Sequence, residues 1–377
     1  MRNNSDPDQI WMVRALELAA RGRYGASPNP MVGAVVLDSA GRLAGEGWHA
    51  TYGGPHAEVV ALDNADQAAR GGTLYVTLEP CAHHGKTPPC VDAIVSAGVR
   101  RVVFAHPDPT ATASGGADRL RAEGVEVREG PGAEQARILN RRWLRWARHK
   151  RPWVTVKAAI SLDGRVATST GQSQWITGES ARARGLELRE EHDAILVGIG
   201  TVLADNPRLT RRLGLNPVSG WRRIVLDSRL RLPSDAEVIR SEPAAVLVAH
   251  TSQASEDDRR RLIDLGVGLV EVSEDEFGRV DVDGLLGELA QREVSALLVE
   301  GGPTVHGSFA DDDLVDEVVF FLAPFLIGGE GLPAVAGKGV PTLELARRLR
   351  FEAVRRHGDD LEISAVRPED EDVHGVG

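Results

Sequence analysis

The sequence predicts a protein of two α/β domains that meet near residue 151. Its 377 residues exceed what one hydrophobic core usually supports, so two domains of roughly 150 to 200 residues are expected. Apolar runs of strand length alternate with helical patterns in both halves, as in α/β folds. Pro152 ends a basic helical stretch just before a new apolar run. We therefore expect a first domain over residues 1–150 and a second over residues 151–377.

The first half alternates between helical and strand patterns. Helices are expected over residues 9–21, from His56 onward, and over residues 89–97, 117–123 and 134–150. Strands are expected over residues 32–37, 73–78, 101–105 and 125–128. The helix at residues 134–150 is basic and amphipathic. We expect five strands with covering helices over the first 145 residues, and these four strands have assigned ranges.

The second half contains a longer series of apolar runs. Strands are expected at residues 153–160, 194–198, 223–226, 245–249, 268–272, 296–299 and 315–322, with helices between several of them. The run that starts at residue 315 has only about ten residues free of charge and glycine, whereas a membrane span needs roughly 20. We interpret it as a buried strand. The acidic tail, PEDEDVHGVG, is expected to be disordered from about residue 368.

Composition limits the partners and the compartment that fit the chain. A formal net charge of −11 and a pI near 5.5 argue against a surface that coats nucleic acid. A basic stretch over residues 137–151 is more simply a solvated helix face. The start lacks the apolar core of a signal peptide, and two cysteines that bind metal leave none for disulfides. The expected location is the cytoplasm, with neither nucleic acid nor a membrane as partner.

A histidine and the only two cysteines indicate a zinc site. They lie in the segments PHAEVVAL and TLEPCAHHGKTPPC. His56, Cys81 and Cys90 can supply one nitrogen and two thiolates to a single Zn²⁺ and leave a fourth tetrahedral position for water, as in catalytic zinc sites. The alternative is that the cysteines are ordinary buried small residues and His56 a surface residue. The dense His, Lys and Pro content around them is a poor composition for a core.

Glu58 is the candidate acid/base of this site. Residues two apart on a helix do not share a face, so His56 and Glu58 are not expected to be paired ligands. The pattern H-x-E followed by P-C and a later cysteine is that of the zinc deaminases, in which the glutamate moves protons to the leaving ammonia. Zinc lowers the pKa of its water to about 7, which suits hydrolysis at neutral pH.

Two glycine segments of the second half could bind phosphate. VEGGPTVHGSF is a strand followed by a glycine turn and a helix, so backbone N–H groups near residues 302–305 could hold a phosphate. A plain tight turn is the alternative. The segment 197–212 supplies Thr201, Asp205, Arg208, Arg211 and Arg212 on one loop, a composition suited to a phosphorylated polyol. No G-x-G-x-x-G follows a strand, so a Rossmann site is not predicted.

Nine segments resemble one known family. They are SPNPMVGAVV, GEGWH, PHAEV, TLEPCAHHGKTPPC, VKAAISLDGR, SQWITG, AILVGIGTVLADNPRLT, VEGGPT and LVDEVVFFLAPFLIGG. Together they make the chain similar to the RibD family of bifunctional riboflavin biosynthesis proteins, over nearly the whole chain. The resemblance implies a cytidine-deaminase-like three-layer domain followed by a dihydrofolate-reductase-like domain. It also implies a homo-oligomer formed through the reductase domain.

The same resemblance implies the reactions and cofactors. The first is zinc-dependent hydrolytic deamination of 2,5-diamino-6-ribosylamino-4(3H)-pyrimidinone 5′-phosphate. The second is NADPH-dependent reduction of the ribosyl group to ribityl. The proton donor of the reduction stays open among Lys157, Asp205 and Glu300, and no arginine is assigned to the 2′-phosphate of NADPH.

Site residues are carried over from the family by motif. The deaminase substrate residues are Asn29, His49, His83, Lys86 and Asp108. The reductase substrate residues are Ser173, Arg189, Leu209, Arg212 and Glu300. The cofactor-binding residues are Ala159, Trp175, Thr201, Asp205, Ser228, Gly302, Pro303, Thr304, Val305, His306, Gly307 and Ser308. Trp175 could instead be a plain core residue.

One segment departs from the family pattern. The family usually has Asn-Pro after Asp108-Pro109, whereas this chain has Thr110, and its loop is one residue shorter. One polar contact to the substrate is therefore expected to be missing or replaced.

Two other functions fit part of the sequence. A nucleoside or tRNA deaminase with an accessory domain would need a broad basic face and leaves the arginine-rich segment 197–212 unexplained. A catalytically inactive, metal-stabilised interaction protein would have no need of Glu58.

Overall fold

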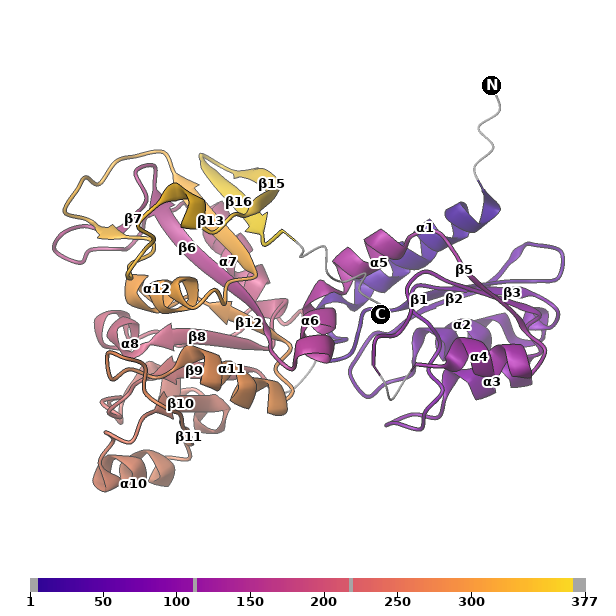
Figure 1. Cartoon of the computed structure of the whole chain (residues 1–377), viewed down its shortest axis with the longest axis horizontal. Coiled ribbons are helices and arrows are strands. Elements are labelled where there is room, and N and C mark those ends of the chain that lie inside the picture. The colour runs from indigo at the N-terminus through magenta and orange to yellow at the C-terminus, as the bar shows by residue number, and fades with distance from the viewer. Residues whose placement is uncertain (1–5, 111–113, 217–219, 369–377) are drawn as a thin grey trace. The chain divides into compact units, whose positions relative to one another are not determined.

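The computed structural model of the chain describes residues 6–110, 114–216 and 220–368. The chain forms two compact units that divide between Lys150 and Arg151, except that Leu215 and Asn216 group with the first unit (Figure 1). Each unit has its own hydrophobic core. The expectation of a disordered tail falls on residues 369–377, which lie outside the described residues.

No helix among the described residues is both long enough and apolar enough to cross a membrane.

The first unit is built on one sheet. Its strands are β1 (Gly33–Leu37), β2 (Leu43–Trp48), β3 (Thr73–Val76), β4 (Arg101–Phe104) and β5 (Glu126–Glu129). Their order in the described chain is β2-β1-β3-β4-β5. β1 pairs antiparallel with both neighbours, whereas β3, β4 and β5 run parallel. All of β1 is buried, because helices cover both faces of the sheet.

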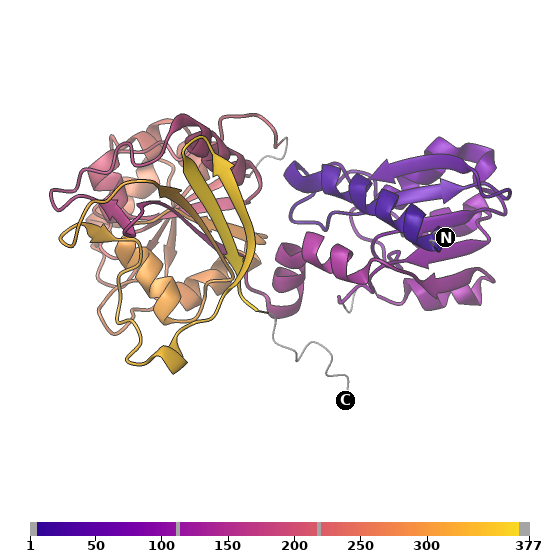
Figure 2. The same ribbon diagram turned by 90° about the horizontal axis from the view of Figure 1, so that it is seen from above.

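Helices enclose this sheet as the predicted three-layer domain (Figures 1 and 2). They are α1 (Pro7–Ala19), α2 (Ala57–Ala65), α3 (Cys90–Ala97), α4 (Gly116–Ala122), α5 (Ala133–Leu139) and α6 (Arg141–His149). α1 and α5 pack on the face that carries Val35 and Val103. α2, α3, α4 and α6 pack on the opposite face, which carries Val36 and Val102. Alternate strand residues thus feed two separate cores.

The prediction of a single helix over residues 134–150 is wrong in one respect. Two helices, α5 and α6, occupy this stretch, and Asn140 separates them with φ −101° and ψ 12°. The buried Asn140 side chain donates to the carbonyl of Met31 at 2.9 Å and accepts from its N–H at 2.7 Å. Because both bonds need Asn140 at one place, tertiary contacts override the helical periodicity of the sequence here.

The second unit is built on a larger sheet. Its strands are β6 (Trp153–Ser161), β8 (Ala194–Gly198), β9 (Arg222–Leu226), β10 (Val246–His250), β11 (Gly268–Glu271), β12 (Ala296–Val299), β13 (Glu317–Ala323), β15 (Arg350–His357) and β16 (Asp360–Val366). The order in the described chain is β11-β10-β9-β8-β12-β6-β13-β16-β15. The strands from β11 to β13 are parallel, and β16 and β15 follow antiparallel. A separate pair joins β7 (Arg165–Ala167) to β14 (Leu332–Pro333).

Helices cover both faces of the larger sheet. They are α7 (Glu179–Glu190), α8 (Ile199–Asp205), α9 (Glu237–Arg240), α10 (Glu256–Asp264), α11 (Val282–Gln291) and α12 (Pro303–Asp311). α11 and α12 share one core with Leu196 and Ile224, while α8, α9 and α10 share another with Ile195 and Val225. This is the dihydrofolate-reductase-like architecture that the family resemblance predicts.

The expected strands are confirmed, but the sequence did not reveal β2, β7, β14 or the hairpin β15–β16. Figure 2 shows this hairpin in yellow at the edge of the sheet. β15 is mostly exposed, so it lacks the alternation that marks a half-buried strand. The buried strand expected from residue 315 ends at Ala323, and Phe325 and Leu326 beyond it are exposed.

A buried carboxylate ties the start of α1 to the sheet. Asp8 is 4% exposed and accepts hydrogen bonds from Arg101 at 2.7 and 3.0 Å and from the Tyr75 hydroxyl at 2.8 Å. The Arg101 hydrogen bonds lower the pKa of Asp8, against the effect of burial. Its contribution to stability is therefore full above the unfolded pKa of about 3.9 and is lost as the pH falls through the lower folded pKa.

We expect Asp8→Ala to lower the free energy of unfolding of the first unit by about 3 kcal/mol, because it leaves the Arg101 guanidinium without its main carboxylate partner. Urea unfolding of the full chain near neutral pH measures the change. Glu17→Gln is the matched control, since Glu17 lies on the same helix and makes an exposed ion pair with Arg14 whose loss should cost less than about 0.5 kcal/mol. Equal losses in the two variants would contradict the stabilising role of the buried pair.

Candidate active sites

Three metal ligands meet in the first unit. His56 is the residue before α2, Cys90 is the first residue of α3, and Cys81 lies in the loop after β3. Their ligand atoms all lie within 4.8 Å of one another, with His56 Nδ1 at 3.1 Å from Cys90 Sγ and 3.6 Å from Cys81 Sγ. The predicted cluster is confirmed. Two of its members start helices, but Cys81 does not.

The donor set fits zinc. Hydrogen bonds from Cys90 and from His56 lower the pKa of Cys81 to about 4, against the effect of burial. A thiolate is the form in which cysteine binds metal. Both sulfurs are buried, and the Cys90 N–H donates to Cys81 Sγ at 3.4 Å. Two sulfur ligands and one imidazole complete three tetrahedral positions and leave the fourth open, which is the pattern of a catalytic zinc site.

Glu58 lies next to this cluster but is not part of it. It sits in the first turn of α2 and is 4% exposed, and burial raises its pKa. Among the described residues the metal-ligand group contains only His56, Cys81 and Cys90. Glu58 lines the same cavity as these three residues. A buried carboxyl beside an open metal position has the geometry of a proton-transfer group.

The metal site opens into a cavity of about 330 Å³. All five expected substrate residues line it, namely Asn29, His49, His83, Lys86 and Asp108. His49 Nδ1 lies 2.9 Å from the carbonyl of Pro55, which can only accept, so Nδ1 carries the proton. Burial lowers the pKa of His49, so its neutral Nε2 accepts from the Asn29 amide at 3.1 Å. This leaves the carbonyl oxygen of Asn29 for a ligand.

The cavity lining also includes groups that sequence reasoning missed. They are Tyr52, Thr87, Trp143 and Trp146. Lys86 Nζ lies 3.7 Å from the centre of the Tyr52 ring, so the ring holds the cation at the rim. Thr87 Oγ1 lies 3.3 Å from His56 Nε2 and orients the metal-binding imidazole. The only signal for Thr87 was its place inside the cysteine segment.

Thr110 also lines this cavity. Its N–H and hydroxyl donate to Asp108 Oδ1 at 2.8 and 2.6 Å. The rest of the shortened loop falls on residues 111–113, which lie outside the described residues.

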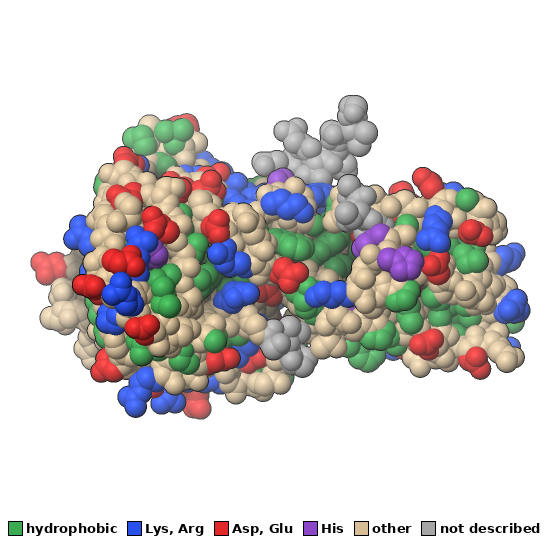
Figure 3. All heavy atoms as spheres, turned by 90° about the horizontal axis from the view of Figure 1, so that it is seen from below, with side chains coloured by type: hydrophobic (Ala, Val, Ile, Leu, Met, Phe, Trp, Pro, Cys, Tyr) green, Lys and Arg blue, Asp and Glu red, His purple; other side chains and the backbone are tan. Residues whose placement is uncertain are grey.

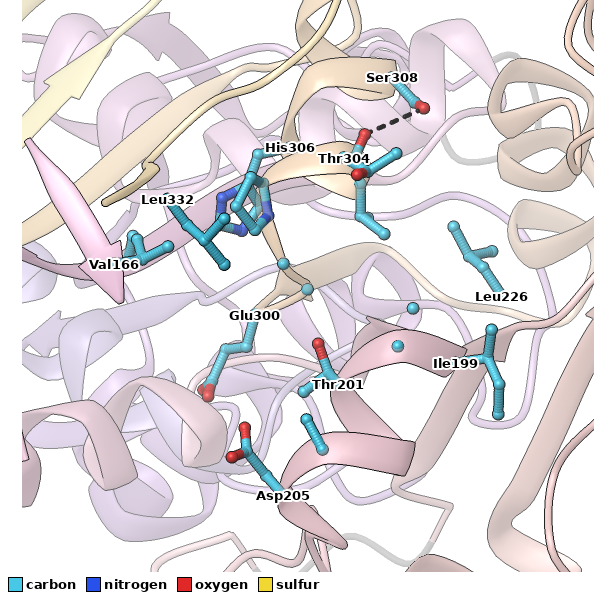
Figure 4. A pocket seen from close by; sticks show the side chains of 18 of the residues that line it. Val166, Ile199, Thr201, Asp205, Leu226, Glu300, Thr304, His306, Ser308 and Leu332 are labelled. Carbon is cyan, nitrogen blue, oxygen red and sulfur yellow. Dashed lines mark hydrogen bonds between the residues drawn. The ribbon is translucent and has the colours of Figure 1, made fainter. Parts of the chain in front are cut away.

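The second unit contains a cavity of about 560 Å³ at the carboxyl ends of its parallel strands (Figure 4). Most of the expected cofactor residues line it, namely Ala159, Thr201, Asp205, Ser228, Gly302, Pro303, Thr304, Val305, His306 and Ser308. Thr201 and Asp205 belong to helix α8, so the expectation that one loop carries the residues of 197–212 is wrong. The Val305 N–H donates to the carbonyl of Gly302, which leaves fewer free N–H groups at this turn than the sequence suggested.

A buried charge cluster lies at one end of this cavity. Glu300 is paired with Arg189 at 2.9 Å and with Lys157 at 3.7 Å. Although burial opposes it, the charges of Arg189 and Lys157 lower the pKa of Glu300 to about 2. Glu300 is therefore ionised at neutral pH, and its two cationic partners are fixed beside the cavity.

His306 is a buried residue of the cavity wall. It is 3% exposed, and its Nδ1 lies 2.8 Å from the carbonyl of Ala334, so Nδ1 carries the proton. Burial lowers the pKa of His306, against the effect of hydrogen bonds to the backbone of Ala334 and Val299. Figure 4 shows the ring at the cavity wall near Leu332.

Several expected residues lie away from the cavity, and their assignment stays a prediction. Leu209 is buried in the core with Ile195, and Arg212 is exposed and not among the lining residues. Gly307 faces Ala336, because an added Cβ would lie 1.3 Å from its carbonyl oxygen. Trp175 is 70% exposed, which excludes the core alternative for it.

The two other arginines of segment 197–212 have structural partners. Arg208 pairs with Glu237 at 2.8 Å. Arg211 donates to the carbonyls of Arg189 and His192, and its guanidinium lies 4.4 Å from the Trp221 ring centre.

Basic and acidic side chains are mixed on the face of the molecule that Figure 3 shows. A broad basic face, as a tRNA deaminase would need, is not present on that view.

Comparisons with known proteins cover both units. Residues 152–363 match the family model of the RibD C-terminal domain, and residues 5–106 match the cytidine and deoxycytidylate deaminase zinc-binding region. The chain is 40% identical over 361 residues to riboflavin biosynthesis protein RibD of Bacillus amyloliquefaciens, which covers 95% of this chain and 96% of that protein. It is 38% identical over 366 residues to the RibD protein of Escherichia coli K12, covering 94% and 98%.

Solved structures agree with these sequence matches. Acinetobacter baumannii RibD superposes with a TM-score of 0.86 at 36% identity and covers 96% of this chain and 98% of that one. A Thermotoga maritima protein described as a diaminohydroxyphosphoribosylaminopyrimidine deaminase/5-amino-6-(5-phosphoribosylamino)uracil reductase gives a TM-score of 0.82 at 34% identity and covers 96% and 99%.

Proposed function

The chain belongs to the RibD family of riboflavin biosynthesis proteins, and from this premise we propose its substrates and the roles of its residues. It is a bifunctional enzyme that joins a zinc-dependent deaminase to an NADPH-dependent reductase. The substrates named for the Thermotoga relative support deamination of 2,5-diamino-6-ribosylamino-4(3H)-pyrimidinone 5′-phosphate, followed by reduction of the ribosyl to the ribityl group. A nucleoside or tRNA deaminase would leave the match of residues 152–363 unexplained.

The observation that carries the deaminase proposal is the position of Glu58 beside the three metal ligands in one cavity. Zinc, when bound by His56, Cys81 and Cys90, supplies Lewis-acid activation of a water molecule. The Glu58 carboxylate accepts a proton from the attacking water and delivers it to the amine that leaves as ammonia. Burial among α2 residues keeps bulk water from competing for this proton.

The residues of the cavity wall are proposed to hold the substrate. The Asn29 carbonyl accepts from ring N–H or amino groups, because its amide is already engaged with His49. Lys86 and His83 lie on the segment between the two cysteines and suit the anionic phosphate. Asp108 accepts from an amino group of the pyrimidine.

We predict that Glu58→Gln retains zinc and loses about 10² to 10⁴ of the deamination rate, because the amide keeps the shape of the side chain but cannot move a proton. Metal content and ammonia release are measured on the same sample. Asp63→Asn is the control, since Asp63 lies on the same helix as Glu58 but is exposed and does not line the cavity. Parallel loss of zinc and activity in Glu58→Gln would show that Glu58 has a structural role.

The reductase proposal assigns the proton donor to Lys157. NADPH, when bound, supplies the hydride. Glu300 is ionised, because Arg189 and Lys157 hold its pKa near 2, so it has no proton to give. Lys157 lies in β6, lines the cavity and is held 3.7 Å from Glu300. Glu300 and Arg189 are therefore positioning residues that fix the ammonium group.

We expect Lys157→Met to reduce the rate of NADPH oxidation by about 10² to 10⁴ with unchanged deamination, since only the proton donor of the second reaction is removed. Stopped-flow turnover and NADPH affinity are measured separately. NADPH binding should persist, because the nucleotide contacts proposed above lie on other residues. Asp205→Asn is the comparison, and a greater loss there than in Lys157→Met would transfer the proton-donor role to Asp205.

The reductase domain is also proposed to form the homo-oligomer. β15 is an edge strand of the sheet and exposes Phe351 (74%) and Val354 (61%), while the preceding segment exposes Leu343 (79%). The unpaired N–H and C=O groups of an edge strand are a template for pairing with another chain, and these exposed apolar side chains would be covered by it. The proposed location is the cytoplasm, consistent with two cysteines that are both free of disulfides.

A cut between Lys150 and Arg151 should give two folded halves, because the units have separate cores. Residues 1–150 should bind one zinc and remain monomeric in light scattering. Residues 151–377 should oligomerise and oxidise NADPH when supplied with the deaminated substrate. A monomeric reductase half would contradict the proposed interface, and an insoluble half would contradict the proposed boundary.

A further inference from the structure

The cavity of the second unit has an end that the roles proposed so far do not explain. Ser228 and Arg231 line it from the turn after β9, and Arg279 lines it from the loop before α11. None of these residues belongs to the charge cluster around Glu300. The cavity end therefore carries two cations that the hydride and proton transfers do not use.

The position of this end follows from the sheet. Lys157 lies on β6, and the strands β12, β8 and β9 follow in order toward Ser228. Three strand spacings of about 4.8 Å separate β6 from β9 by about 14 Å. If the nicotinamide lies near Lys157, this end of the cavity receives the part of the cofactor that is remote from the nicotinamide.

Arg231 is anchored at one atom only. The buried Asp227 accepts the Leu232 N–H at 2.8 Å and Arg231 Nε at 3.4 Å, which fixes the turn after β9. Within the described chain the two Nη groups of Arg231 have no partner, and its side chain is 59% exposed. A guanidinium held through Nε presents its Nη groups as a fork that matches phosphate oxygens.

Arg279 approaches the same end from a second loop. Asp275 accepts the N–H groups of Phe277 and Arg279 at 2.8 Å each, and its carboxylate also holds Arg279 Nε at 2.8 Å and Nη2 at 2.7 Å. The guanidinium lies 4.6 Å from the centre of the Phe277 ring. The loop thus holds Arg279 in a fixed orientation before any ligand arrives, which lowers the entropic cost of binding.

We propose that Arg231 and Arg279, together with the Ser228 hydroxyl, bind the 2′-phosphate of NADPH. This phosphate is the only chemical difference between NADPH and NADH, so the three residues set the choice between the two cofactors. The inference rests on the proposed reductase function. It assigns residues to the 2′-phosphate, for which no contact has been proposed above. The Nη fork of Arg231, the second Nη group of Arg279 and a hydroxyl match a dianionic phosphate monoester.

The test measures binding rather than turnover. Calorimetry on the full chain compares its affinity for 2′,5′-ADP with that for 5′-AMP, and its affinity for NADPH with that for NADH. Arg231→Gln and Arg279→Gln should each raise the dissociation constants for 2′,5′-ADP and NADPH by about 10- to 100-fold, because a charge-assisted hydrogen bond is lost. The affinities for 5′-AMP and NADH should change less than about twofold. Arg231→Lys should recover part of the affinity, since a charge remains without the fork.

Arg229→Gln is the matched control. Arg229 lies in the same turn, donates to Gln253 at 2.9 Å and does not line the cavity, so the same charge change should leave all four affinities unaltered. Equal weakening of 5′-AMP and 2′,5′-ADP in Arg231→Gln would overturn the proposal, as would unchanged 2′,5′-ADP binding. Ribose 5-phosphate tests the substrate phosphate as the alternative occupant, and a selective loss of its binding would also overturn the proposal. Failure of the parent chain to bind NADPH would instead reject the reductase function itself.

Discussion

Parallel pairing of neighbouring strands is the constraint on which both active sites depend. Parallel strands end at the same edge of a sheet, so the loops that follow them meet there. In the first unit β3 and β4 are parallel, and the loops after them carry Cys81 and Asp108 to one cavity. In the second unit β6, β12, β8 and β9 are parallel, which brings Glu300 and Ser228 to another cavity although they are far apart in the sequence. Each catalytic arrangement is thus a consequence of strand direction before it is a consequence of side-chain choice.

Within the first unit, two glycines allow the metal-binding helix to reach its position. A Cβ at Gly45 would lie 2.2 Å from the carbonyl oxygen of Ala61, and a Cβ at Gly47 would lie 2.6 Å from that of Ala57. Any side chain at these positions of β2 would push α2 away from the sheet, and His56 and Glu58 would move with its first turn. The same requirement explains why β2 has no strand-like pattern in the sequence. Its residues are selected for close packing against a helix rather than for apolar alternation.

The site residues that could be predicted are those that belong to short local sequence motifs. His56, Cys81 and Cys90 were found because metal chemistry restricts the residue types, and their spacing places them at the ends of adjacent elements. Thr87, Trp143 and Trp146 were missed, since nothing in their local sequence distinguishes a cavity wall from a core. The helix break at Asn140 depends on hydrogen bonds to Met31, which is over a hundred residues away. Helical periodicity reflects local sequence only and cannot indicate such a contact. For the same reason the state of Glu300 could not be inferred before Arg189 and Lys157 were seen beside it.

The departure at Thr110 illustrates how one side chain can satisfy a site by a different route. Thr110 donates both its N–H and its hydroxyl to Asp108 Oδ1, and the Asp108 N–H donates to Glu79 Oε2 at 3.2 Å. These bonds fix the carboxylate and, as far as the described residues go, leave its second oxygen for a ligand. An asparagine at this position could offer an amide to the substrate directly, whereas threonine orients Asp108 to make the contact. Threonine and asparagine at this position thus differ by one neutral hydrogen bond of about 0.5 to 1.5 kcal/mol, which is a two- to twelve-fold effect on the affinity for the substrate. Because Thr110 keeps Asp108 oriented, we expect the deaminase site to tolerate the change.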